Sequence, residues 1–173
     1  MEAVEVTAVN QCSGNSRGFF QPRVNGGQLA HGAMGNAKWR GVRLKDVLAK
    51  AGIAAGAKQV VCNGLDAGAL PTTPDFIKAL EVAHALDGEV LIAWSMNDED
   101  LPWLNGYPLR LIVPGYYGTY WIKHLNSLEV VDDTVPPPPM LGMSMLWNVA
   151  VVPGAAAPAT MTLEAGLPGG VTG

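Results

Sequence analysis

A cysteine beside arginines in a polar loop is the feature of the sequence best suited to chemistry. Residues 12–17 read CSGNSR, and Arg23 follows six residues later. A lone cysteine is usually a small buried hydrophobe, but this segment is too polar to need one. Gly14 and Asn15 permit a tight backbone that presents main-chain N–H groups. The nearby positive charges favour the thiolate form of Cys12, which is the ligand that a soft metal ion prefers.

The second cysteine has different surroundings. Cys62 lies in an apolar segment, where a buried and inert thiol is expected. The two cysteines could form one disulfide, but their contrasting neighbours predict different roles. Zinc is disfavoured because the sequence has no Cys-x-x-Cys or His-x-x-x-His pair, and its histidines stand far apart at positions 31, 84 and 124.

The loop must be positioned by short strands. Alternating residues predict a strand over residues 3–9, and the Gly-, Asn- and Arg-rich residues 12–35 predict a long loop. Apolar runs predict further strands at residues 59–62, 90–94, 109–113 and 128–131.

The expected helices are also short. Leu44, Val47 and Leu48 recur at helical spacing, and Gly52 marks the helix end. A capping residue, a proline and an early carboxylate at positions 73–75 predict a helix through Leu80. Residues 121–125 predict a helical turn. Strands and helices follow one another without a regular βαβ rhythm, so the predicted fold class is α+β, with mixed sheets and short helices.

Charge is distributed unevenly along the chain. Residues 1–60 contain eight Lys/Arg and three Asp/Glu, whereas residues 61–133 contain three and eleven. A basic first part suits an anionic cofactor or substrate. Nucleic acid is disfavoured because no dense basic run is interleaved with aromatic residues, and no apolar stretch is long enough to span a membrane.

Composition divides the chain at residue 133. Residues 1–133 are predicted to form one folded unit. Residues 134–173 contain four consecutive prolines, a single charged residue and no lasting periodicity. This Pro-, Gly- and Ala-rich tail is predicted to be disordered or to arise from a shifted reading frame, and to stay apart from the core.

Six collinear motifs resemble the molybdopterin-dependent sulfite oxidase family. After the CSGNSR loop come GAMGNAKWRGV, NGLD, AWSMN, NGYPLR with VPGYYG, and WIKHL, between residues 32 and 125. Together the motifs make the resemblance specific over residues 5–133. Their details are most similar to bacterial sulfite dehydrogenases and to the related sulfane dehydrogenase catalytic subunit.

The resemblance implies a role for individual residues. Cys12 would be the one protein ligand of molybdenum, and Arg17 would face the anionic substrate as a catalytic residue. The remaining residues would contact the molybdenum-molybdopterin cofactor: Ser13, Asp66, Asn105, Arg110, Ile122, Lys123 and His124. His124 stands where many relatives have Trp, so it is expected to neighbour the cofactor and not to act as a base.

The implied activity is the oxidation of sulfite, or of a related sulfur compound, to sulfate. Electrons would pass to a c-type cytochrome in the bacterial periplasm, and intact relatives are homodimeric or paired with a cytochrome subunit. A sulfoxide reductase of the same fold is an alternative, although Arg17 and the tyrosines at 116 and 117 favour the sulfite branch.

Some family features are not matched. The family has an Arg and a His upstream of the Cys loop, an active-site Tyr after the last strand and a dimerising β-sandwich domain. Here the chain is expected to begin after that upstream segment, and Tyr120 is the last tyrosine. Asn105 replaces a common His. These departures keep a further alternative open, a cofactor-binding fragment that is catalytically incomplete.

Overall fold

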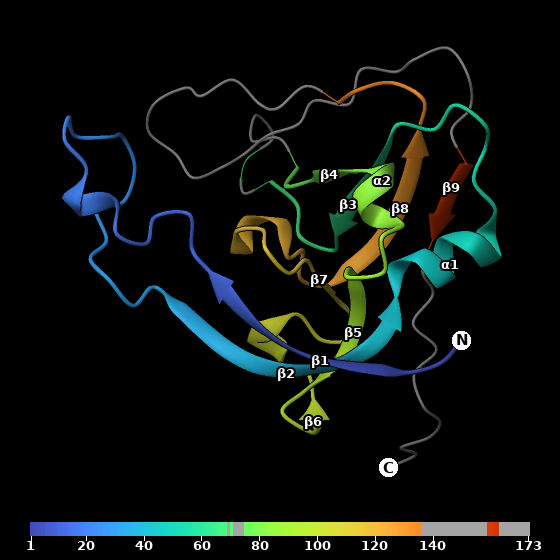
Figure 1. Ribbon diagram of the computed structural model, residues 1–173, viewed down its shortest axis with the longest axis horizontal. Helices are drawn as coiled ribbons and strands as arrows, with labels where there is room; N and C mark the ends of the chain where they lie inside the picture. The colour runs from blue at the N-terminus through green and yellow to red at the C-terminus, as the bar shows by residue number, and fades with distance from the viewer. Residues whose placement is uncertain (69, 71–74, 136–158, 163–173) are drawn as a thin grey trace.

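The chain folds around two antiparallel sheets. The computed structural model describes residues 1–68, 70, 75–135 and 159–162. The first sheet has the order β1-β2-β5-β6, with β7 also paired to β5, and the second has the order β4-β3-β8-β9 (Figure 1). Strands and short helices are mixed along the chain, as predicted, and the α+β fold class is confirmed.

The first sheet carries the cysteine loop. β1 (Val4–Gln11) and β2 (Met34–Arg43) form a long hairpin. β5 (Leu91–Met96) pairs with β2 on one side and with β6 (Glu99–Asp100) and β7 (Arg110–Ile112) on the other. Figure 1 shows the loop between β1 and β2, in blue, extending beyond the rest of the chain.

The second sheet and the helices complete the fold. β3 (Gln59–Gly64) pairs with β4 (Lys78–Glu81) and β8 (Leu125–Val131). Within the described residues, the α-helices are α1 (Leu44–Ala51) and α2 (Val82–Ala85). The same part of the chain contains the 3-10 turns η1 (Arg17–Phe19), η2 (Trp103–Asn105) and η3 (Gly118–Tyr120). α1 ends at Gly52, whose φ of 85° suits glycine, so this predicted helix and its end are confirmed.

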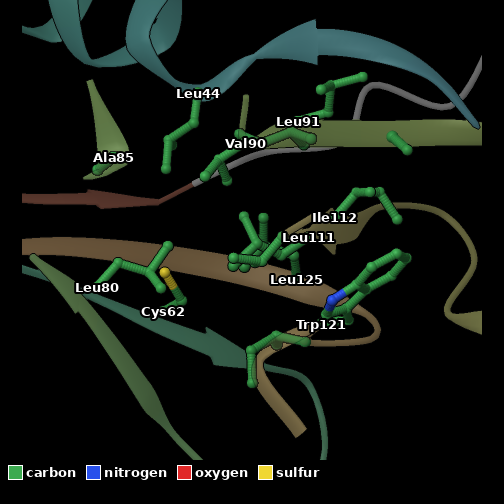
Figure 2. Close-up of a cluster of buried hydrophobic side chains, with 14 of the residues drawn as sticks. Leu44, Cys62, Leu80, Ala85, Val90, Leu91, Leu111, Ile112, Trp121 and Leu125 are labelled. Carbon is green, nitrogen blue, oxygen red and sulfur yellow. The ribbon is translucent and has the colours of Figure 1, made fainter. Parts of the chain in front are cut away.

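The hydrophobic core joins both sheets to both helices. Leu91 and Ile112 come from the first sheet, Cys62 and Leu125 come from the second, and Leu44 comes from α1. Figure 2 shows these side chains in one cluster. Cys62 is fully buried, which confirms the prediction for this thiol, and burial raises its pKa to about 12.

Two predicted helices are wrong. Residues 78–81 form β4, and they pair with β3 where a helix was expected; positions 73 and 74 lie outside the described residues. Residues 121–125 were expected to form a helical turn, but the turn lies just before them, in η3. His124 and Leu125 donate their backbone N–H groups to Gly106 and Leu109, so distant segments replace the local bonds of a helix.

Besides β4, three of the described strands were not predicted: β2, β6 and β9. β2 begins inside the expected loop, because residues 34–36 adopt an extended conformation when they pair with residues 9–11 of β1. β9 (Ala159–Thr162) pairs with β8, so the backbone of these four tail residues joins the edge of the second sheet. The prediction that the tail stays apart from the hydrophobic core concerns side chains, and it stays a prediction. The remaining residues after position 135 lie outside the described part, and the division at residue 133 stays a prediction. Within the described residues, no helix is both long enough and apolar enough to cross a membrane.

Candidate functional site

Cys12 begins the thiol loop, defined here as residues 12–33. Its backbone N–H donates to Ala33 O at 2.9 Å, which closes the loop where the hairpin ends. The N–H of Gly14 points at Cys12 Sγ, 3.4 Å away, and Ser16 adopts a left-handed conformation at the turn. The sulfur of Cys12 is therefore held by the backbone of its own turn.

Arg17 is held against the same turn. Its Nη2 atom donates to Ser13 O at 3.1 Å, so the predicted residue Ser13 contributes its carbonyl. The guanidinium also lies where a side chain on Gly26 would be, and Gly26 has a φ of 111°. The loop backbone therefore holds the guanidinium of Arg17 against the turn that contains Cys12.

A second group of predicted residues gathers in the glycine cradle, defined here as residues 64–66, 105–110 and 122–124. A Cβ on Gly64 would lie 2.5 Å from Lys123 O and 2.6 Å from Asp66 Oδ1. A Cβ on Gly106 would lie 2.9 Å from the Cβ of Lys123. The two glycines thus let three segments that are far apart in sequence approach closely.

Arg110 is the buried cation of the cradle. Its residue is 8% exposed, and its Nη1 atom donates to Asn105 O at 3.0 Å. Its guanidinium lies over the rings of Trp39 and Trp121, at 5.2 and 5.9 Å. Its Nε atom is buried and has no hydrogen-bond partner in the described part of the chain. Burial lowers the Arg110 pKa to about 10.

Lys123 and His124 lie at the open side of the cradle. Lys123 Nζ donates to Leu104 O at 3.1 Å, and His124 Nδ1 lies 2.7 Å from Tyr107 O. His124 has a φ of 52°, and its ring lies 5.1 Å from that of Trp103. These contacts hold both side chains against residues 103–107. The Lys123 carbonyl lies near the Asp66 carboxylate at Gly64, and the Asp66 side chain is exposed.

Ile122 is the predicted cofactor residue that the structure places differently. It is 2% exposed and belongs to the core, so any contact with a ligand would come from its backbone. Asp66, Asn105, Arg110, Lys123 and His124 do come together, as the sequence predicts. Whether they bind a cofactor stays a prediction.

Two contacts hold β1, the strand that leads into the thiol loop, near the cradle. Trp39, which packs on Arg110, donates from Nε1 to Ala8 O on β1 at 3.3 Å. Asn10, also on β1, lies against Gly118 of η3. Sequence reasoning assigned neither Trp39 nor Asn10 to the site, because their importance depends on which strands become neighbours.

An anionic, sulfur-ligated metal cofactor fits these donors. The buried Arg110 guanidinium keeps an unused donor, and a buried positive charge normally has an anionic partner. The cradle backbone leaves no room for side chains at Gly64 and Gly106. Cys12 offers the soft ligand that a metal such as molybdenum would accept.

Comparison with known proteins agrees with this chemistry. Residues 1–138 match the family described as oxidoreductase molybdopterin binding domain. The chain is 39% identical over 132 residues to the mitochondrial sulfite oxidase of Drosophila melanogaster, covering 73% of the chain and 23% of that protein. It is 37% identical to an NADH nitrate reductase of Ulva prolifera over 141 residues, covering 76% of the chain and 16% of that protein.

A solved structure has a similar fold over most of this chain. The crystal structure of the sulfane dehydrogenase SoxCD from Paracoccus pantotrophus matches with a TM-score of 0.64 and 27% identity, over 77% of this chain and 33% of that one. The chain spans about a quarter of the length of the sulfite oxidase from Drosophila melanogaster. It belongs to the sulfite oxidase family of molybdopterin-dependent oxidoreductases, and it matches part of their molybdopterin-binding domain.

Proposed function

We propose that this chain binds molybdenum-molybdopterin and takes part in oxidising sulfite, or a related sulfur compound, to sulfate. The observation that supports this best is Arg110, a buried guanidinium with an unused Nε donor and two aromatic neighbours. A charged hydrogen bond to an anionic group would contribute about 1.5–3 kcal/mol. Asp66, Asn105, Lys123 and His124 would hold the rest of the cofactor.

The thiol loop would supply the other half of the site. Cys12 would ligate the metal, with the Gly14 N–H stabilising the negative sulfur. Arg17, fixed by Ser13 O, would hold the sulfite anion and orient it. When bound, the cofactor would supply the two-electron oxidation and the transfer of an oxygen atom.

We extend the proposal to the electron acceptor and the compartment. A c-type cytochrome in the bacterial periplasm is proposed, since both accompany the sulfite dehydrogenases that the motifs resemble. The 37% identity to a nitrate reductase shows that overall similarity does not fix the substrate. The substrate assignment therefore depends on Arg17 and its neighbours in the loop.

Cofactor binding without turnover is a second candidate. Leu65, Trp103 and Leu104 lie next to Lys123 and His124, and they are 65%, 68% and 80% exposed. A cofactor on this face would meet water, where each charged contact is weaker. The chain by itself would then hold the cofactor but oxidise sulfite slowly.

One experiment tests the proposal and separates the two candidates. The chain is loaded with molybdenum-molybdopterin, its molybdenum and pterin contents are measured, and sulfite-dependent reduction of cytochrome c is followed. Molybdenum uptake with turnover near 10 per second, a typical enzyme rate, supports the dehydrogenase. Uptake with very slow turnover supports the second candidate. Absence of stoichiometric molybdenum in a folded chain contradicts both.

A further inference from the structure

The end of β1 rests on the backbone of η3. A Cβ on Gly118 would lie 2.5 Å from Asn10 Oδ1, 3.2 Å from its Cγ and 3.3 Å from its Nδ2. The whole carboxamide of Asn10 therefore occupies the space beside Gly118. Figure 1 shows the tip of β1 next to η3, the gold turn near the centre.

Each partner in this contact is close in sequence to a part of the proposed site. Asn10 precedes Cys12 by two residues, which is about 7 Å along a strand. Gly118 precedes residues 122–124 of the glycine cradle by four residues. A shift of either partner would therefore change the position of the thiol relative to the cradle.

Packing holds the Asn10 side chain more than its own hydrogen bonds do. Its Nδ2 atom is buried and has no hydrogen-bond partner in the described part of the chain. A buried amide without an acceptor is uncommon and destabilising. An apolar side chain of similar size would avoid that cost, so stability alone does not explain an asparagine at this position.

We propose that Asn10 and Gly118 form a positioning contact that sets the place of the Cys12 thiol relative to residues 122–124. The inference rests on the proposed function, because it treats Cys12 as the molybdenum ligand. Gly118 lacks a side chain so that the carboxamide can approach, and Asn10 is a positioning residue that need not touch the cofactor.

Gly118→Ala tests the contact, with Gly35→Ala as the matched control. Gly35 is the register partner of Asn10 on β2, and a Cβ there would meet no atom within 4 Å. Each full-length variant is loaded with cofactor, and the electron paramagnetic resonance spectrum of Mo(V) is recorded with kcat and KM. We expect Gly118→Ala to change the spectrum and to lower kcat by about 100-fold, the effect of misplacing a group by about 1 Å. Gly35→Ala should match the wild type.

A second variant separates positioning from folding. Asn10→Ala combined with Gly118→Ala removes the overlap, so the double variant should recover much of the kcat lost in Gly118→Ala and return the spectrum toward that of the wild type. If Gly118→Ala does not fold, Asn10→Ala alone should fold and still alter the spectrum. The inference is wrong if Gly118→Ala behaves like Gly35→Ala, if the double variant is as defective as Gly118→Ala, or if a folded Asn10→Ala leaves the spectrum unchanged.

Failure of the proposed function would appear separately. In the cofactor-free chain, the alkylation rate of Cys12 reports the loop position without any molybdenum. Gly118→Ala should change this rate relative to Gly35→Ala even if the wild-type chain takes up no metal. An equal rate in both variants would contradict the positioning contact.

Discussion

The thiol loop and the glycine cradle hold their charged groups in opposite ways. The loop is open to solvent, with Phe19 and Phe20 59% and 56% exposed, and its own backbone fixes Cys12 and Arg17. The cradle buries Arg110 against two tryptophans and lets three distant segments meet at glycines. Local sequence thus places the reactive thiol, whereas tertiary packing places the buried cation.

This difference separates two kinds of contribution. Changes in the loop should alter chemistry with little effect on stability, because few buried contacts depend on its side chains. Changes in the cradle should weaken cofactor binding, and at its glycines, where distant backbones approach closely, they should also lower stability. The following variants test that separation, from the largest expected effect to the smallest.

Cys12→Ala should lower sulfite turnover by more than about 100-fold, since even the partners of metal ligands contribute about 10- to 100-fold in metal affinity. Its thermal stability should stay within about 0.5 kcal/mol of the wild type. Molybdenum content and thermal unfolding are measured on the same samples. Cys62→Ala is the control and should do the reverse, keeping activity but losing stability, because Cys62 is fully buried. Equal sulfite turnover in Cys12→Ala and the wild type would show that Cys12 is not the ligand.

Arg110→Met should raise the Kd for the cofactor by about 10- to 100-fold, the loss of one charged hydrogen bond. The stability of the cofactor-free chain should change by no more than about 1 kcal/mol, because the cost of burying the charge is set against one hydrogen bond to Asn105 O and two ring contacts. Titration with cofactor and urea unfolding check the two effects. Arg40→Met, at an exposed position on β2, should change neither quantity. Strong destabilisation of cofactor-free Arg110→Met would mean that the guanidinium is structural.

Gly64→Ala should lower the free energy of unfolding by about 1–3 kcal/mol, because the added methyl group meets the Lys123 carbonyl and the Asp66 carboxylate. Cofactor binding should weaken in the same variant. Chemical denaturation gives the first value and cofactor titration the second. Gly35→Ala, in open space at the base of the thiol loop, should leave both unchanged. Comparable losses in the two variants would remove the distinction between cradle and loop.

Lys78 on β4 gives the smallest effect. It is 5% exposed, and burial lowers its pKa from 10.5 to about 8. Between these pH values the unfolded chain binds a proton that the folded chain has released, so stability should rise with pH. We expect Lys78 to contribute a gain of about 1 kcal/mol between pH 8 and 10.5, a value reduced for partial solvent access.

The gain should be absent from Lys78→Met, measured by urea unfolding at several pH values between 7.5 and 10.5. Lys58→Met, at an exposed position in the same part of the fold, is the control and should keep the wild-type pH dependence. A Lys78→Met profile parallel to that of the wild type would show that the burial of Lys78 does not affect its titration.

Much of the site could be predicted, because its signals are local. Thiol, arginine, glycine and asparagine types within residues 12–17 already indicate an anion- and metal-binding turn. α1 follows from the spacing of Leu44, Val47 and Leu48, which all prove to be buried. Family motifs added the cradle residues, and the structure brings the polar ones together.

The errors share one physical cause. A capping pattern at residues 73–75 predicted a helix, yet residues 78–81 pair with β3. A helical turn was also predicted at residues 121–125, yet His124 and Leu125 donate their N–H groups to the carbonyl groups of Gly106 and Leu109. Local propensity is worth less than the backbone hydrogen bonds and burial that a neighbouring strand offers.

The sequence by itself determined the family, the α+β class and the residue types of the thiol loop. These depend on residue types at short spacing, which folding does not change. Only the tertiary structure decided that Arg110 is buried against Trp39 and Trp121, and that Asn10 lies against Gly118. Such contacts join residues far apart in the chain, and they form only after the strands have paired and the core has excluded water.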